Sequence, residues 1–206
     1  MIRSDTDRRT FSFALFTGLA DCFNRSGETV TNDGNESDDA NESSEDNPAL
    51  SEATQLGDLQ LTSPAFDDGD EIPEEYGYNE ENVSPPFEID GVPDEADTLV
   101  LVVDDPDALE PAGRIWVHWL VWNIPPETST IPEGWESEDV VEGENDFGGL
   151  CYDGPSPPDD VHTYRFKLYG IDTVLDLEEG ATVDELGEAI DDRVVARSQL
   201  TGTYAP

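Results

Sequence analysis

Apolar residues recur along the C-terminal part of the chain in the short alternating or continuous runs that β-strands produce. Residues 59–63 alternate between apolar and polar positions before a proline and an acidic turn. Residues 98–103 form a continuous apolar run with β-branched side chains, which is typical of a strand buried on both faces. Residues 115–124 and 164–171 are two further long strand candidates, and 200–204 is a short last one.

Helical spacing occurs near the C-terminus. Thr182 and Glu185 match a capping box, in which the two side chains satisfy each other's backbone amides. The apolar positions that follow at helical spacing are Val183, Leu186, Ile190 and Val194. They predict an amphipathic helix of roughly 12 to 16 residues. Many strands, turn-rich loops and one late helix indicate a mainly β fold, an antiparallel β-sandwich with a C-terminal amphipathic helix.

Residues 1–22 have the layout of an export signal. A charged start contains the pair Arg8 and Arg9, which resembles a twin-arginine signal, and a short apolar stretch leads to Cys22. Cys22 resembles the lipid-accepting cysteine of a lipoprotein, although Asp21 departs from the small residue expected before it. We expect a cell-surface protein, lipid-anchored at Cys22 to the outer face of the cytoplasmic membrane. The alternative is a cytoplasmic protein with a chance arginine pair.

Residues 23–56 contain almost no apolar side chains and consist mainly of Asn, Ser, Glu, Asp, Gly and Thr. Such a segment cannot bury a core, so it is expected to be a disordered, acidic tether. The folded domain is then expected at 57–206.

The charge of the chain is extreme. Its 206 residues include 50 Asp and Glu but only 9 Lys and Arg, and the formal net charge is −41. A folded domain with this self-repulsion needs salt to screen it, and at about 1 M salt the Debye length is roughly 3 Å. The composition therefore predicts a halophilic protein. It also argues against nucleic acid as a partner, because no basic stripe is present to neutralise phosphates.

Two clusters carry the candidate chemistry, and each contains one of the chain's two histidines. His118 follows an Asp-Pro-Asp turn and lies beside Trp116, while His162 follows a proline-rich loop and precedes Tyr164. A carboxylate that accepts a hydrogen bond from an imidazole favours the protonated ring, whose other N–H can face an anion. We therefore expect both histidines to face one concave site with Asp105.

Other interpretations of these residues stay open. His118 could be a satisfied core residue, and the Asp-Pro-Asp turn could be a plain surface turn. Ser156 could serve as a nucleophile with a histidine as base. Zinc binding is disfavoured because the chain has no closely spaced ligand pair, so no metal and no cofactor is predicted.

Several motifs together resemble the phosphatidylethanolamine-binding protein family, in its prokaryotic Raf-kinase-inhibitor-like branch. They include the Asp-Pro-Asp turn at 105–107, Trp-Val-His-Trp at 116–119, and the segments 142–148, 152–158 and 162–169. The resemblance implies a β-sandwich with a small surface pocket for phosphate, phosphorylated headgroups, acetate or similar anions. By this resemblance the pocket would be lined by Asp105, Asp107, Trp116, His118, Gly154, His162 and Tyr164, with Tyr152, Ser156 and Pro158 at its rim. Ser156 departs from the cysteine common at that place in prokaryotic relatives.

The leading functional hypothesis is non-enzymatic binding of a small anionic ligand, with a regulatory role left open. One alternative is a hydrolase-type enzyme that uses His118 with Ser156 or Asp105. Another is a regulator of the kinase-inhibitor type that docks on a protein partner. The sequence identifies no such partner and leaves a homodimer open.

Overall fold

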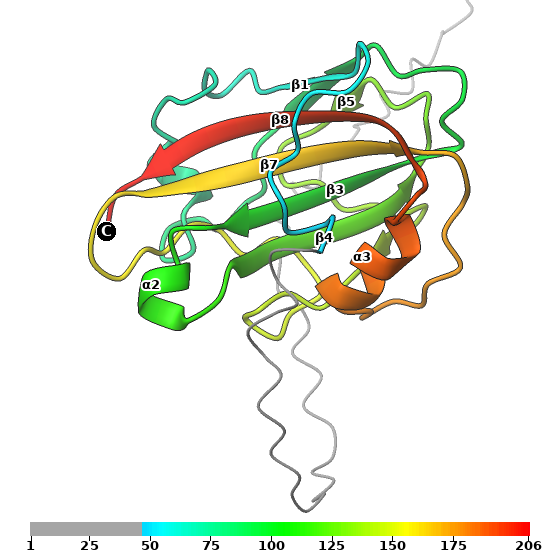
Figure 1. The fold of residues 1–206 in the computed structure, drawn as a ribbon. Coiled ribbons are helices and arrows are strands. Elements are labelled where there is room, and N and C mark those ends of the chain that lie inside the picture. The colour runs from blue at the N-terminus through cyan, green and yellow to red at the C-terminus, as the bar shows by residue number, and fades with distance from the viewer. Residues whose placement is uncertain (1–46) are drawn as a thin grey trace, which may run out of the picture.

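The computed structural model describes residues 47–206, which form two antiparallel β-sheets packed face to face (Figure 1). The larger sheet has the order β6 (Val141–Glu142), β4 (Trp116–Ile124), β3 (Thr98–Asp105), β7 (His162–Ile171) and β8 (Val194–Tyr204). The smaller sheet has the order β1 (Gln60–Thr62), β2 (Phe87–Asp90) and β5 (Thr130–Ile131). Short helices are η1 (Glu74–Tyr76), α2 (Leu109–Ala112) and α3 (Val183–Ile190). The predicted mainly β fold is confirmed.

The central strand β3 is buried along its whole length because both faces of the larger sheet are covered. Leu99, Leu101 and Val103 face the core between the two sheets. Val100 and Val102 point the opposite way, into a second core, as the two-residue repeat of a strand requires. The continuous apolar run of this strand follows directly from this double coverage.

Helix α3 covers part of the second core with Leu186 and Ile190. It begins with the predicted capping box at Thr182 but is shorter than predicted. The chain turns extended at Asp191 and takes a positive φ of 59° at Asp192. Val194 is therefore the first residue of β8, where it pairs with Ile171, and its assignment to the helix was wrong.

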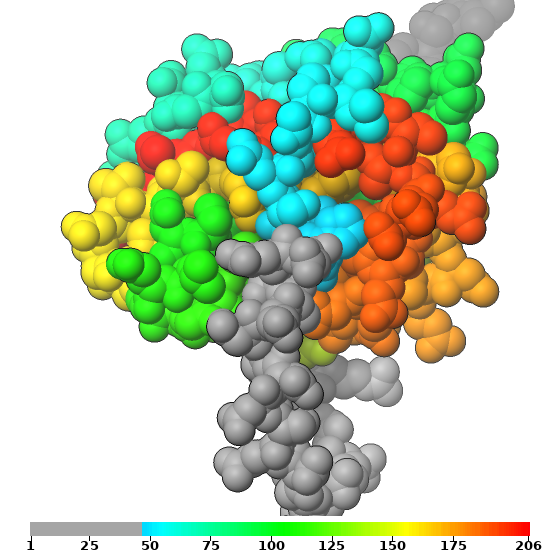
Figure 2. Space-filling model, in the orientation of Figure 1, coloured from blue at the N-terminus to red at the C-terminus, as the bar shows by residue number. Residues whose placement is uncertain are grey.

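Residues 47–56, which the sequence placed in the tether, pack on the domain. In Figure 1 the chain from residue 47 crosses the larger sheet from β4 towards β1, and in Figure 2 this cyan segment lies against α3. Ala49, Leu50 and Ala53 are buried in the second core, and Leu56 pairs with Arg197 of β8. The predicted domain boundary at residue 57 is therefore too late.

This crossing segment is held by side chains of β7 that point to the same face. Arg165 donates to the carbonyl oxygen of Leu50 over 2.8 Å, and the Tyr169 hydroxyl donates to that of Pro48 over 3.1 Å. Between them Lys167, the only lysine of the chain, donates to the Ala49 carbonyl. Side chains of β7 take the role that a neighbouring strand or a helix would have, since they donate hydrogen bonds to the backbone carbonyls of this segment. The segment can therefore pack on the domain without the residue pattern of a strand or a helix.

The predicted signal at 1–22, the lipidation site Cys22 and most of the predicted tether lie outside the described residues. Among residues 47–206, no helix has the length and apolar character needed to cross a bilayer.

Candidate functional site

A cavity of about 300 Å³ opens at the end of the larger sheet where β3 finishes and its antiparallel neighbours β4 and β7 begin. This meeting of strand ends brings Asp105, His118 and Tyr164 together although they are distant in sequence. The full lining is Tyr78, Asn79, Asp105, Ala108, Pro111, Ala112, Trp116, His118, Phe147, Ser156, Pro158 and Tyr164. We call this cavity the strand-end pocket.

His118 enters the strand-end pocket through an irregularity of β4. The register pairs Val103 with Trp119 and Asp104 with Val117, so His118 is the extra residue of a β-bulge. Bulges commonly re-aim a side chain next to a site. Because of this bulge, Leu120 does not share the pocket with His118 although it is two residues away, and it lies in the second core.

The ring of His118 is held in one tautomer. Its Nδ1 lies 2.6 Å from the carbonyl oxygen of Asp153, which can only accept, so Nδ1 carries the hydrogen. Burial lowers the pKa of His118, against the opposing pull of the Asp153 hydrogen bond and the charges of Asp105 and Asp104. The ring is then neutral near pH 7, and Nε2 is a hydrogen-bond acceptor.

His162 lies behind the pocket and orients its carboxylate. Its Nδ1 is 2.7 Å from Oδ2 of Asp105, and its Nε2 is 3.2 Å from Oδ1 of Asp159. Burial alone would lower the pKa of His162, but the hydrogen bond and charge of Asp105, with that of Asp159, raise the pKa overall. Both ring nitrogens are engaged and the residue is not part of the lining, so the expectation of two histidines facing one site is wrong.

Asp105 is almost fully buried, and its two carboxylate oxygens accept hydrogen bonds from different partners. Oδ1 accepts from the amides of Asp107 and Ala108, at 2.9 and 3.1 Å, while Oδ2 accepts from His162. The Asp-Pro-Asp turn thus fixes a carboxylate at the pocket wall. Asp107 itself is exposed and accepts from the Thr163 amide at 2.7 Å, so it ties β7 to the turn and does not line the cavity.

Two buried donors of the lining make no hydrogen bond of good geometry with the described residues, Trp116 Nε1 and the Tyr164 hydroxyl. The Tyr164 hydroxyl nevertheless lies near enough to Asp105 and the Ser156 backbone to interact with both. Burial and the nearby charge of Asp105 raise the pKa of Tyr164, so its hydroxyl keeps its proton. Trp122 Nε1 and Arg197 Nε are unsatisfied as well but lie outside the lining, whereas in the strand-end pocket a ligand or water has room to supply an acceptor.

Aromatic rings form one wall of the strand-end pocket. Phe147 stacks on Tyr78 with ring centroids 4.6 Å apart, and it also contacts Trp116 and His118 at 5.5 and 5.4 Å. Sequence reasoning missed Tyr78, Asn79, Phe147 and the residues of α2 as lining residues. Phe147 lies in the segment 142–148, which carries part of the family resemblance. The residues around Tyr78 form no motif that would have indicated its place in the pocket.

Two further predicted residues shape the pocket from outside. The amide of Gly154 donates to Asn82 over 2.8 Å, and a side chain at Gly154 would collide with the carbonyl oxygen of Tyr76. The hydroxyl of Tyr152 donates to the same Tyr76 carbonyl over 3.0 Å. Neither residue is part of the lining. They instead fix the loop whose Ser156 and Pro158 do line it, as predicted.

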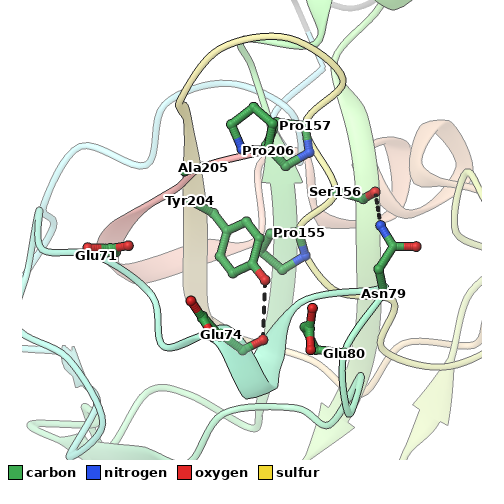
Figure 3. A pocket seen from close by; sticks show the side chains of 10 residues that line it. All are labelled: Glu71, Glu74, Asn79, Glu80, Pro155, Ser156, Pro157, Tyr204, Ala205 and Pro206. Carbon is green, nitrogen blue, oxygen red and sulfur yellow. Dashed lines mark hydrogen bonds between the residues drawn. The ribbon is translucent and has the colours of Figure 1, made fainter.

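Ser156 and Asn79 separate the strand-end pocket from a second cavity of about 230 Å³ (Figure 3). Ser156 Oγ accepts from Asn79 Nδ2 at 3.1 Å. Within residues 47–206 neither histidine makes a hydrogen bond to Ser156. The nucleophile–base contact that would favour a hydrolase is thus not formed.

The second cavity holds Glu71, Glu74 and Glu80, and the Tyr204 hydroxyl donates to the Glu74 carbonyl oxygen over 3.2 Å (Figure 3). It contains none of the buried ionisable side chains described above. The strand-end pocket is therefore the stronger candidate site.

The two packed sheets and the strand-end pocket define a β-sandwich protein with a small cavity at one end of its larger sheet. A family model for the phosphatidylethanolamine-binding protein matches residues 62–205, and the chain belongs to this family. The resemblance seen in the motifs is thereby confirmed. The family is generally one of binding and regulatory proteins.

Relatives and solved structures agree with this assignment. A UPF0098 protein of Methanothermobacter thermautotrophicus is 44% identical over 151 residues, which cover 71% of this chain and 98% of that protein. YbhB of Escherichia coli, also a UPF0098 protein, is 32% identical over 160 residues, covering 71% of this chain and 100% of that protein. The crystal structure of a phosphatidylethanolamine-binding protein homologue from Chlamydia trachomatis has a TM-score of 0.68 and 41% identity, over 72% of this chain and 97% of that one. Escherichia coli YbcL, described as a new member of the mammalian family, has a TM-score of 0.67 and 26% identity, over 72% and 98%.

Proposed function

We propose that this protein is a non-enzymatic binding protein whose strand-end pocket captures a small anionic compound: phosphate, a phosphorylated headgroup or a carboxylate. The observation that carries this proposal is the buried Trp116 Nε1, which makes no hydrogen bond with the described residues, beside the Tyr164 hydroxyl in the lining of one cavity. A buried polar group without a partner costs about 1–3 kcal/mol. An acceptor oxygen of a bound ligand would remove that cost, so these donors favour a ligand rich in oxygen acceptors.

The sequence suggested that a protonated histidine attracts the anion. We propose instead that the attraction between the pocket and its ligand does not involve a charged histidine. His118 presents Nε2 as an acceptor, and the charge of His162 is taken up by Asp105 and Asp159. Binding instead rests on short-range hydrogen bonds inside a largely apolar cavity. Such interactions work in molar salt, where long-range attraction is screened.

We further propose that this binding takes place at the surface of a halophilic cell, on a domain exported in the folded state and anchored through a lipid at Cys22. The support is the layout of residues 1–22 and the net charge of −41. A regulatory use of the bound ligand fits the general character of the family.

Two tyrosine-to-phenylalanine variants distinguish a role in ligand binding from a role in stability. Tyr164→Phe removes a hydroxyl that lines the strand-end pocket and makes no hydrogen bond of good geometry with the described residues, whereas Tyr152→Phe removes one that donates to the Tyr76 carbonyl. We expect Tyr164→Phe to weaken phosphate and acetate binding about tenfold, with stability unchanged. Tyr152→Phe should lower stability by about 1 kcal/mol and leave affinity unchanged.

Titration calorimetry and thermal unfolding in 2 M KCl, on the wild type and both variants, measure these effects. The absence of binding of either anion to the wild type, or equal affinities for the wild type and Tyr164→Phe, would contradict the proposal.

A further inference from the structure

We infer that the strand-end pocket binds its ligand as a protonated acid, and that this ligand is a weak acid with an apolar, ring-sized body. The candidates are an aromatic or similarly compact carboxylic acid, or the monoanion of a phosphate ester of such a group. The inference rests on the proposed function and narrows it: among the acids proposed above, the pocket takes the form that keeps one acidic proton, which is the neutral form of a carboxylic acid and the monoanion of a phosphate ester.

The hydrogen-bonding groups of the lining carry the first part of the inference. Trp116 Nε1 and the Tyr164 hydroxyl offer donors, whereas His118 Nε2 offers an acceptor, because its Nδ1 donates to Asp153. Asp105 adds a carboxyl group at the same wall. A group that matches this set has acceptor oxygens and one O–H of its own. A carboxylic acid and a singly protonated phosphate have both, but their fully ionised forms offer acceptors only.

The charges around the pocket favour the same form of the ligand. Asp105 and Asp104 on β3 and Asp153 in the loop before β7 all act on His118, yet burial lowers the pKa of that ring. On β7, His162 is already hydrogen-bonded to both Asp105 and Asp159, and these carboxylates together with the charge of Asp107 raise its pKa.

The nearest arginines and the lysine are engaged elsewhere. Arg114 lies over the Trp116 ring and pairs with Asp146 at 2.9 Å, and it lines a different cavity. Arg165 and Lys167 both bind Asp104 next to the second core. Among the lining residues there is no Lys or Arg, so no cation of the lining offsets the charge of a fully ionised ligand.

The size and walls of the cavity carry the second part. A dry apolar cavity of about 150 Å³ is enough to hold benzene. The strand-end pocket, at about 300 Å³, has room for a ring together with an acid group. The walls of the pocket suit a ring. The aromatic side chains of Tyr78, Phe147 and Trp116 lie on one side. The small or apolar residues Ala108, Pro111 and Ala112 of the α2 segment also line the pocket. Inorganic phosphate alone would leave this apolar surface uncovered.

The test uses three probes on the full chain in 2 M KCl between pH 5 and 8. Benzoic acid ionises near the ordinary carboxyl pKa of about 4, and phenyl phosphate loses its second proton near pH 6, as phosphate monoesters do. Benzamide keeps one carbonyl acceptor and an N–H donor at every pH in this range.

Calorimetric affinity for benzoate should fall about tenfold per pH unit across the whole range, since only the acid form binds. Affinity for phenyl phosphate should be level up to about pH 6 and fall above it, and that for benzamide should not change with pH. The half-point of each curve then follows the pKa of the ligand. Phenyl phosphate should also bind at least tenfold more tightly than inorganic phosphate at pH 5.

The outcomes separate the inference from the proposed function. Affinities for benzoate and phenyl phosphate that begin to fall at the same pH within the range would mean that a protein group sets the pH dependence. Binding that tightens as pH rises would mean that the ionised form is preferred. Either result overturns the inference while leaving anion binding intact. If neither benzoate, phenyl phosphate nor inorganic phosphate binds at any pH, the proposed function fails as well. Phosphate that binds as tightly as phenyl phosphate would overturn the ring-sized body.

Discussion

The Nδ1 atom of His162 lies 2.7 Å from Oδ2 of Asp105, and both side chains are about 5% exposed. The carboxylate is also held by two backbone amides on its other oxygen. This buried pair fixes the position of the one acidic group in the strand-end pocket, although His162 is itself outside the lining. Breaking the pair should therefore affect the stability of the domain before it affects ligand contacts.

His162→Gln should destabilise the domain most at acidic pH. The pKa of His162 is raised in the folded state above its ordinary value of 6.5. A raised histidine pKa contributes stability that is complete below 6.5 and is lost as pH rises through the folded-state value. The deficit of His162→Gln relative to the wild type should be about 1.5–3 kcal/mol at pH 5.5 and smaller at pH 9. Urea unfolding in constant high salt measures it.

His118→Gln is the matched control because its linkage has the opposite sign. Burial lowers the pKa of His118, so the wild type loses stability through this residue as pH falls below 6.5. The stability of His118→Gln relative to the wild type should therefore improve towards acidic pH. A deficit of His162→Gln that is constant from pH 5.5 to 9 would show that His162 is neutral in the folded protein.

The crossing segment 47–56 should prove essential for full stability. Deletion of residues 1–56 removes buried Leu50 and the carbonyl acceptors of Arg165 and Lys167, whereas deletion of residues 1–46 keeps them. The longer deletion should be less stable than the shorter one by about 3–5 kcal/mol, or roughly 10 °C in Tm. Thermal unfolding of the two truncated proteins in the same salt measures the difference.

A pair of point variants isolates the packing contribution. Leu50→Ala empties a position that is 5% exposed, whereas Leu56→Ala changes one that is 39% exposed. Leu50→Ala should cost about 2–5 kcal/mol and Leu56→Ala much less. Equal melting temperatures for the two deletions, together with a neutral Leu50→Ala, would mean that the segment contributes nothing to the fold.

Local patterns in the sequence were sufficient to predict most of the secondary-structure elements of the fold. The apolar run of β3 and the capping box at Thr182 indicated their elements because burial on two faces and amide capping act within a few residues. The site could be predicted only in part. His118 and Tyr164 line the strand-end pocket. The bulge that turns His118 into it arises from the register of β4 with β3, which the sequence of β4 alone does not determine.

The errors have the same physical origin. His162 was expected in the pocket, yet its two nitrogens are taken by carboxylates 57 and 3 residues away in sequence. The segment 47–56 read as tether because it lacks periodicity, but its carbonyls are satisfied by side chains of β7 more than 100 residues away. Long-range polar partners of this kind leave no local pattern.

The predicted lipid anchor can be checked on protein from cells. Cys22→Ser should move the protein from the membrane fraction to the soluble or secreted fraction, because one acyl-bearing cysteine is what retains it. Mass spectrometry of the wild type should find a mature chain that begins at a lipidated Cys22. An intact Met1, or Cys22 found in a disulfide, would contradict the anchor.

Salt should stabilise the domain and strengthen ligand binding at the same time. The net charge of −41 makes the folded chain repel itself and any anion that approaches it. Raising KCl from 0.1 to 1 M shortens the Debye length from about 10 Å to about 3 Å, which removes most of both repulsions. The hydrogen bonds of the strand-end pocket and the buried pairs of Asp104 are short and dry, so screening weakens them little. Tm and the affinity for phosphate should therefore rise together between 0.1 and 2 M KCl.

Sucrose, which stabilises proteins by exclusion without screening charge, is the control and should raise Tm without raising affinity. A Tm and affinity that are unchanged by KCl would mean that the acidic surface does not oppose folding or binding.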